Sequence, residues 1–192
     1  KCEKEIDTMS KWKSDGDWIY EVAANGTECT IRKYEGKNES IVVPEQCGGY
    51  PVTAFGNDVS CVFTFPKVQI VVFPSTVVRI TSCAFLCCKT LEKVILPMSL
   101  LSIGDNAFLG CTSLKSIELP ISISCIEYRT FSCCESLVSV TIPSSVKKIK
   151  SLSFLGCYKL NQVIFNEGLE SIGHYAFGLT SISKVVLPDS II

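Results

Sequence analysis

The sequence predicts a right-handed solenoid that is rich in β-structure, with a parallel sheet along one face. Phenylalanine returns at a constant interval of 23 residues, and the same apolar pattern surrounds each one. A period of this size is typical of a coil whose single turns cannot bury their own apolar faces, so the turns must stack on one another. The phenylalanines of this series are Phe85, Phe108, Phe131, Phe154 and Phe177.

Composition limits the possible partners. The 192 residues carry 18 basic and 19 acidic side chains, without a long run of either sign. Near-neutral charge disfavours nucleic acid or an anionic membrane as the partner. No apolar run approaches the roughly 20 residues that a membrane-spanning helix needs. The sequence therefore predicts one continuous domain whose partner is neither nucleic acid nor a membrane interior.

The first 43 residues precede the repeats. Residues 1–17 are polar and predict a poorly ordered leader. Residues 18–43 predict a β-hairpin cap, because the strand-like segments 18–22 and 29–32 flank a turn at Asn25-Gly26. A third strand is expected at residues 41–43. A cap of this kind would cover the first turn of a solenoid, which we expect over residues 44–192.

Each repeat opens with isoleucine and continues through phenylalanine, cysteine and leucine into a short alternating segment that proline closes. The alternating segments are 94–96, 117–119, 140–142, 163–165 and 185–187, and the closing prolines are Pro74, Pro97, Pro120, Pro143 and Pro188, with Asn166 as the exception. Alternation predicts a strand whose middle residue points outward, and proline, which cannot donate to a ladder, ends it. On the return side we expect short strands, with a helical or 3₁₀ turn around each phenylalanine.

The repeat, written L-x-x-V-x-L-P-x-x-V-x-x-I-x-x-x-A-F-x-x-C, resembles a leucine-rich repeat of the BspA-like class, the Treponema pallidum type. The resemblance covers roughly residues 41–192 and is most specific over 114–134. It implies a leucine-rich repeat solenoid in a secreted or surface-attached protein of a bacterium or a protist, which binds host or neighbouring-cell proteins. The entry segment Gly48 to Thr53 resembles bacterial members and favours a bacterial source. The family has no fixed binding motif to carry over.

The C-terminal end is apolar. The sequence stops at Ile191-Ile192, partway through a turn, without a polar cap after it. An open apolar end favours aggregation. We therefore expect either that the natural protein continues or that this end packs against something.

Twelve cysteines are compatible with a disulfide framework, but their placement argues against one. One column of the repeat holds Cys88, Cys111, Cys134 and Cys157. Buried free cysteine behaves as a small hydrophobic residue, so we expect these four to be reduced core residues. Four other cysteines lie in or near the cap, where one disulfide is an open alternative. They are Cys2, Cys29, Cys47 and Cys61.

The sequence predicts neither catalysis nor a metal or cofactor. The doublets Cys87-Cys88 and Cys133-Cys134 lack the C-x₂₋₄-C spacing of zinc sites, and neighbouring side chains in an extended segment point to opposite sides. His174 is the only histidine, and no cysteine occupies a matching position beside it. Paired carboxylates are also unconvincing, because Glu92 and Glu118 lie in different columns.

The candidate binding surface is the outward side of the parallel strands. Its middle column is unusually apolar, with four aliphatic residues among six, and an exposed apolar strip can mark an interface. The alternative is that β-branched residues merely suit strands. The candidate partner-binding residues are Val72, Ile95, Glu118, Thr141, Ile164 and Val186 in that column, with Lys93 and Lys184 beside it.

Three functions fit these observations. The leading one is a non-catalytic, adhesin-like module that binds a protein partner at the surface of a cell. A structural spacer within a larger surface protein is the second. An intracellular interaction scaffold is the third, supported by the many apparently reduced cysteines, although thiols also persist outside the cells of anaerobes.

Overall fold

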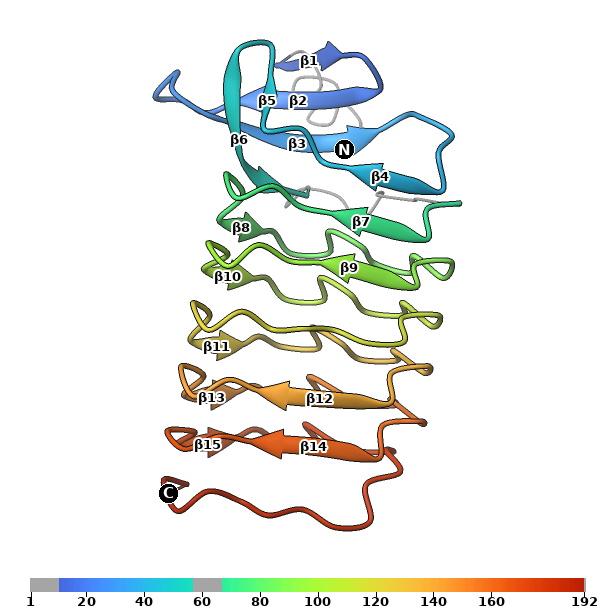
Figure 1. Cartoon of the computed structure of the whole chain (residues 1–192), viewed down its shortest axis with the longest axis vertical. Helices are drawn as coiled ribbons and strands as arrows, with labels where there is room; N and C mark the ends of the chain where they lie inside the picture. The colour runs from blue at the N-terminus through green and yellow to red at the C-terminus, as the bar shows by residue number, and fades with distance from the viewer. Residues whose placement is uncertain (1–10, 57–66, 192) are drawn as a thin grey trace, which may run out of the picture.

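In a computed structural model, residues 11–56 and 67–191 form a β-solenoid whose turns stack along one axis (Figure 1). No helix occurs among these described residues. The face sheet consists of β4 (Ser40–Val42), β7 (Ile70–Val72) and β9 (Lys93–Ile95), followed by β12 (Ser139–Ile142) and β14 (Gln162–Phe165). All pairings within each group are parallel, with equivalent residues of successive turns side by side. The solenoid and its parallel sheet are confirmed.

A second set of short parallel strands runs along the opposite side of the coil, as expected. It comprises β8 (Arg79–Ile80) and β10 (Ser102–Ile103), then β11 (Cys125–Ile126), β13 (Lys148–Ile149) and β15 (Ser171–Ile172). In each of these strands the isoleucine points inward and all but the last are buried. Most turns therefore contribute one strand to each side, and the apolar core lies between the two sides.

The N-terminal end is a small antiparallel unit. Strands β2 (Trp18–Val22) and β3 (Cys29–Tyr34) pair antiparallel around a turn at Asn25-Gly26, where the Asn25 side chain accepts a hydrogen bond from the Thr27 amide. Residues 1–17 were predicted to be a poorly ordered leader. Residues 12–15 of that segment instead form strand β1 (Trp12–Asp15), which pairs antiparallel with β2. Residues 1–10 of that leader lie outside the described residues.

The unit joins the solenoid through β6. Strand β6 (Tyr50–Phe55) runs parallel to β3 on one side and β8 on the other, and it forms a short hairpin with β5 (Gln46–Cys47). The hairpin occupies the segment around Glu45 to Tyr50, where the sequence carries an insertion. Strand β4 pairs with β7 and so belongs to the face sheet, although the sequence pattern placed it in the cap.

The repeating phenylalanines form a continuous stack of parallel rings. Neighbouring ring centroids lie 5.0 to 5.4 Å apart, and the ring planes differ by 16° or less. Phe73 and Phe165 approach the two ends of the stack edge-on. The stack contains Phe55, Phe85, Phe108, Phe131, Phe154 and Phe177, the first of which comes from β6 and lies outside the 23-residue series.

The stretch around each phenylalanine forms tight turns instead of the expected helical turn. Two residues per turn, four positions apart, have positive φ, for example Cys83 and Cys87 at 57°. This alternation points amide groups along the solenoid axis, so that the amides of Cys83, Phe85 and Cys87 donate to carbonyl oxygens of the next turn at 2.7 to 2.9 Å. A helical turn would direct the same amides along its own axis, where the neighbouring turn could not pair with them.

One positive-φ column alternates between cysteine and glycine. It contains Cys87, Gly110, Cys133, Gly156 and Leu179. A left-handed conformation costs an L-residue roughly 1–2 kcal/mol but costs glycine little. Replacing Cys87, whose side chain is exposed, with glycine is therefore expected to raise the free energy of unfolding by about 1 kcal/mol, measured by urea denaturation.

The reverse substitution in the next turn provides the matched comparison. Gly110→Ala places a Cβ at φ +75°, where it would meet the Cys87 Sγ at 3.3 Å. We expect a loss of about 1 kcal/mol. Equal stability of the two variants would show that this column carries no backbone strain.

The four column cysteines are buried free thiols. The Sγ atoms of Cys111, Cys134 and Cys157 lie 3.1 to 3.3 Å from main-chain carbonyl oxygens of the preceding turn. Burial raises the pKa of Cys111 and Cys134 well above 9.0, and that of Cys157 to about 12. These residues are therefore neutral core donors. In the cap, Cys29 and Cys47 are buried and free, whereas Cys2 and Cys61 lie outside the described residues.

Candidate protein-interaction face

The face sheet presents two outward columns, because residues two apart in a strand lie on the same side. We call this surface the sheet face. Its middle column contains Val42, Val72, Ile95, Glu118, Thr141, Ile164 and Val186, and its flanking column contains Ser40, Ile70, Lys93, Ser116, Ser139, Gln162 and Lys184. The strand registers place each of these residues beside its equivalent in the neighbouring turn from β4 to β9 and from β12 to β14.

The aliphatic residues of the middle column are exposed to different extents. Val42 has 67% of its surface exposed, Ile95 43%, Ile164 47% and Val186 76%, while Val72 is half-buried. Val42 had no place in the column predicted from sequence. The alternating apolar segment Ile41 to Val43 could have predicted its position, because the first and third residues of that segment are buried and the middle residue is exposed.

The ladder of the face sheet is interrupted in its centre. Residues 117–119 were expected to form a strand, but between β9 and β12 only an isolated bridge joins Lys93 to Ser116. Ile117 is nevertheless buried and Glu118 exposed, as in the neighbouring turns. The buried Ile117 side chain thus keeps Glu118 directed outward, although the strand pairing is lost. The segment 185–187 is also not a strand.

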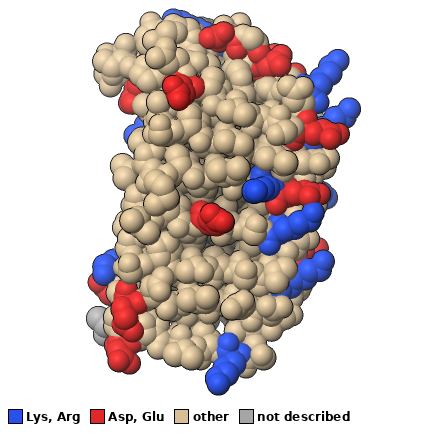
Figure 2. All heavy atoms as spheres, viewed as in Figure 1, with Lys and Arg blue, Asp and Glu red and all other residues tan. Residues whose placement is uncertain are grey.

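Charged groups are sparse on the sheet face and gather at its margin. In Figure 2 most of this side is uncharged, and basic and acidic groups follow one another along its right-hand edge. Lys115 and Glu92, which come from successive turns, form an exposed ion pair. Within the part of the chain that the structure describes, the side chains of Glu118, Lys93 and Lys184 have no ion-pair or hydrogen-bond partner. Their charges are therefore available to a partner.

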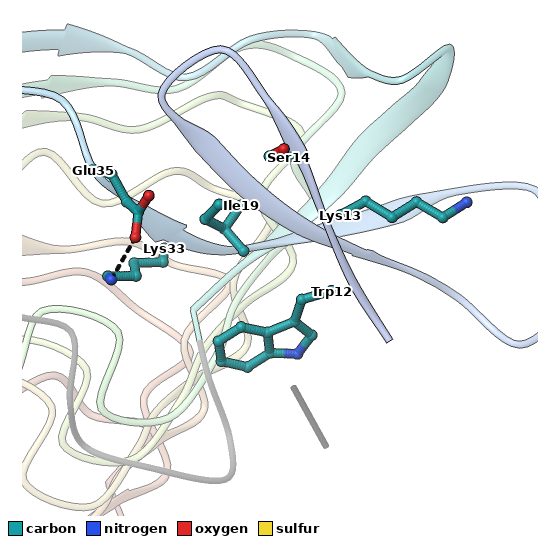
Figure 3. A pocket seen from close by; sticks show the side chains of 6 residues that line it. All are labelled: Trp12, Lys13, Ser14, Ile19, Lys33 and Glu35. Atoms are coloured by element: carbon teal, nitrogen blue, oxygen red, sulfur yellow. Dashed lines mark hydrogen bonds and ion pairs between the residues drawn. The ribbon is translucent and has the colours of Figure 1, made fainter. Parts of the chain in front are cut away.

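Two shallow hollows lie at the ends of the molecule. One, of about 380 Å³, lies between β14 and residues 184–188 and includes Ile164 and Val186 of the sheet face. The other, of about 270 Å³, lies in the cap beside the Trp12 indole, with Ile19 and the Lys33–Glu35 ion pair around it (Figure 3). Neither brings together the side chains that acid–base or nucleophilic chemistry requires.

The other candidates for chemistry are possible metal ligands, the single histidine and the cysteine doublets. Within residues 11–56 and 67–191, no three His, Cys, Asp or Glu side chains cluster as a metal site would require. His174 is exposed and its ring lies edge-on against Tyr175, with centroids 4.2 Å apart. Cys87 is exposed and Cys88 is buried, so the two thiols of that doublet do not converge. The described residues also contain no helix long and apolar enough to cross a membrane.

Stacked 23-residue turns, a phenylalanine core and a parallel sheet on one face define the leucine-rich repeat class of solenoids. The model of the BspA-type leucine-rich repeat region matches residues 78–192 in six copies. The chain belongs to this family, as its sequence pattern indicated. No curated protein matches the chain.

Solved structures agree with this assignment. A leucine-rich cell surface protein from Faecalibacterium prausnitzii is 30% identical, with a TM-score of 0.81 over 94% of the chain. The chain spans 49% of that protein's length. The leucine-rich repeat protein of T. pallidum is 26% identical, with a TM-score of 0.65 over 84% of this chain and 85% of its own. A leucine-rich repeat protein from Eubacterium ventriosum, 21% identical with a TM-score of 0.72, covers 88% of the chain and is matched over 48% of its own length; it shows the fold alone.

Proposed function

We propose that this chain is a non-catalytic module of a bacterial surface protein, and that it binds a protein partner through the sheet face. Leucine-rich repeat solenoids generally serve protein interaction, because their stacked turns present a long, rigid surface. The observation that carries the proposal is the exposed aliphatic column, which remains largely free of charge over several turns.

The burial pattern supports binding over a purely structural role. The register places every outward strand residue in this column, but a polar β-branched residue such as Thr141 would satisfy the strand equally well, so the exposed aliphatic residues beside unpaired charges favour a binding role. Ile95 and Ile164 each leave more than two fifths of their surface in water, and the free carboxylate of Glu118 lies between them along the column. Apolar contact with fixed charges provides both affinity and orientation.

The family membership supports the location. The Faecalibacterium protein is described as a cell surface protein and shares 30% identity with this chain. A position outside the cell gives an interaction module access to host or neighbouring-cell proteins. The spacer role would need no such exposed column.

The double substitution Ile95→Lys and Ile164→Lys is expected to abolish partner binding, with a loss of at least 100-fold in affinity. Each change places a charged, hydrated group where the partner must displace water. Surface-immobilised chain would first be tested against a panel of purified host and bacterial surface proteins. Binding of the captured partner would then be compared between the variant and the parent by surface plasmon resonance.

The control is Leu101→Lys. Leu101 is exposed to 58% and precedes β10 on the other side of the coil. It matches the test residues in chemistry but lies outside the sheet face. Unchanged affinity in the double variant, with an intact circular dichroism spectrum, would remove the sheet face from the proposal. A loss in the Leu101 variant alone would place the binding surface elsewhere.

A further inference from the structure

Six consecutive residues of the middle column form a symmetric pattern. From Val72 to Val186 they read two aliphatic residues, two polar residues and two aliphatic residues. The centre of these six lies between Glu118 and Thr141, and Val42, the first residue of the column, has no counterpart beyond Val186. Reversal of the column therefore places aliphatic against aliphatic and polar against polar residues. Such self-complementarity is what an isologous interface with a two-fold axis requires.

We infer that the sheet face binds a second copy of this chain, face to face, around a two-fold axis that runs parallel to the strands between the turns of Glu118 and Thr141. The inference rests on the proposed function, because it names the partner of the same surface. Rotation about such an axis reverses the order of the turns and leaves the strand direction unchanged. The two sheets are then packed in the aligned manner of β-sandwiches.

This arrangement sets one apolar residue against a charged one, Ile70 against Lys184, at each end of the strip. Ile95 of one copy faces Ile164 of the other, and Val72 faces Val186. Glu118 faces Thr141, whose hydroxyl can donate a hydrogen bond to the carboxylate. In the flanking column Lys93 faces Gln162, Ser116 faces Ser139 and Lys184 faces Ile70, so that no like charges meet.

The other two-fold arrangement is less favourable. An axis parallel to the solenoid makes each turn face its own counterpart. Centred on the middle column, it places the two Glu118 carboxylates against each other, which have no cation partner. Shifted by one column, it places Ile95 against Lys93 and Val186 against Lys184, two apolar–charged contacts where the proposed axis has only that of Ile70 with Lys184. Like charges in contact or an apolar residue against a charged one both weaken association.

The size of the face sets the strength of the dimer. Six turns about 4.8 Å apart give a strip roughly 24 Å long, and strands of three to four residues make it about 12 Å wide. The two copies together would bury on the order of 600 Å², below the roughly 1,200 Å² of stable interfaces. We therefore expect a weak, reversible dimer that forms in the range of tens to hundreds of micromolar.

Sedimentation velocity of the chain from 10 µM to 1 mM, with a thiol reductant to exclude intermolecular disulfides, is expected to show concentration-dependent dimerisation. Ile95→Lys is expected to eliminate the dimer over this range, and Leu101→Lys to leave it unchanged. A monomer at 1 mM, or an Ile95→Lys variant that associates like its parent, would overturn the inference.

The orientation of the two copies has its own test at Thr141. Thr141→Lys places a positive charge opposite Glu118 of the second copy, and the two-fold axis creates this contact twice. It is therefore expected to tighten association at least threefold. Thr141→Glu aligns like charges and is expected to weaken it at least tenfold. Equal effects of the two variants would rule out this axis. Absence of self-association would overturn this inference but not the proposed function. The proposed function is tested separately, by the binding of a captured heterologous partner and the loss of that binding in the double variant of Ile95 and Ile164.

Discussion

Replacing Phe131 with alanine is expected to lower the free energy of unfolding by about 3–5 kcal/mol. The ring is fully buried between those of Phe108 and Phe154, with centroids 5.4 and 5.3 Å away. Its removal opens a cavity in the middle of the stack, and both neighbouring turns lose their contact with it. Because each turn is stabilised mainly by its neighbours, this loss also weakens the coupling between the two halves of the solenoid.

Urea denaturation followed by circular dichroism would measure the effect. A total stability of about 5–15 kcal/mol makes a loss of this size a large fraction of the whole. Tyr158→Ala is the control, since that aromatic side chain is exposed to 54% and a surface truncation should cost less than about 0.5 kcal/mol. A loss below 1 kcal/mol for Phe131→Ala would mean that the stack collapses around the gap and is not a rigid spine.

The fold was predictable because every position of the repeat is observed about five times. Phe85 and its equivalents, the cysteine column and the inward residues of the strands all recur at the same interval, so each assignment is supported by the others. The structure places these residues in the core as the pattern indicates. A single strand such as β1 has no such repetition. Its residues Trp12 to Asp15 are mostly polar and exposed, and the sequence pattern could not separate them from a leader.

Backbone conformation was less predictable than burial. The column of Cys87 and Gly110 adopts positive φ in every turn, but only glycine or asparagine signals this in a sequence. Residues such as Leu152 and Arg129 adopt the same conformation because amide bonds to the next turn compensate for the strain. Phe55 was missed for a different reason, since its backbone pairs with Ile80 and its ring nevertheless stacks on Phe85, 30 residues further along the chain.

The outward side chains of the candidate surface were predictable, because alternation of buried and exposed residues along a strand determines which side chains point outward. Ile95 and Ile164 point outward because their neighbours are anchored in the core, and that relation is present in the sequence. The unpaired state of Glu118 depends on where its neighbours in adjacent turns point, so only the structure provides it. The symmetric pattern of the column likewise becomes a property of one continuous surface only when the structure shows that the turns stack in register.

Replacing Cys157 with alanine is expected to destabilise the protein at neutral pH and to stabilise it in alkali. Burial raises the pKa of this thiol from 9.0 to about 12. Below pH 9 the thiol is protonated and neutral in both the folded and the unfolded protein, so its contribution to the free energy of unfolding is fully present. Between pH 9 and pH 12 only the unfolded state loses its proton, and stability falls as pH rises through that window. At pH 10.5 the penalty to the parent reaches about 2 kcal/mol.

At pH 7 the variant lacks the Sγ contact with the Phe131 carbonyl oxygen and is expected to be less stable by about 1 kcal/mol. The two opposing effects cancel near pH 10, and above it the variant becomes the more stable protein. Urea midpoints of both proteins at pH 7, 9 and 10.5, under reducing conditions, would show this crossing. All other ionisable groups are common to the two proteins, and among them the pKa of Cys134, which Cys157 helps to raise, is held well above 9.0 mainly by burial in both. A difference that stays constant with pH would mean that water reaches this thiol, and that the cysteine column is not sealed within the core.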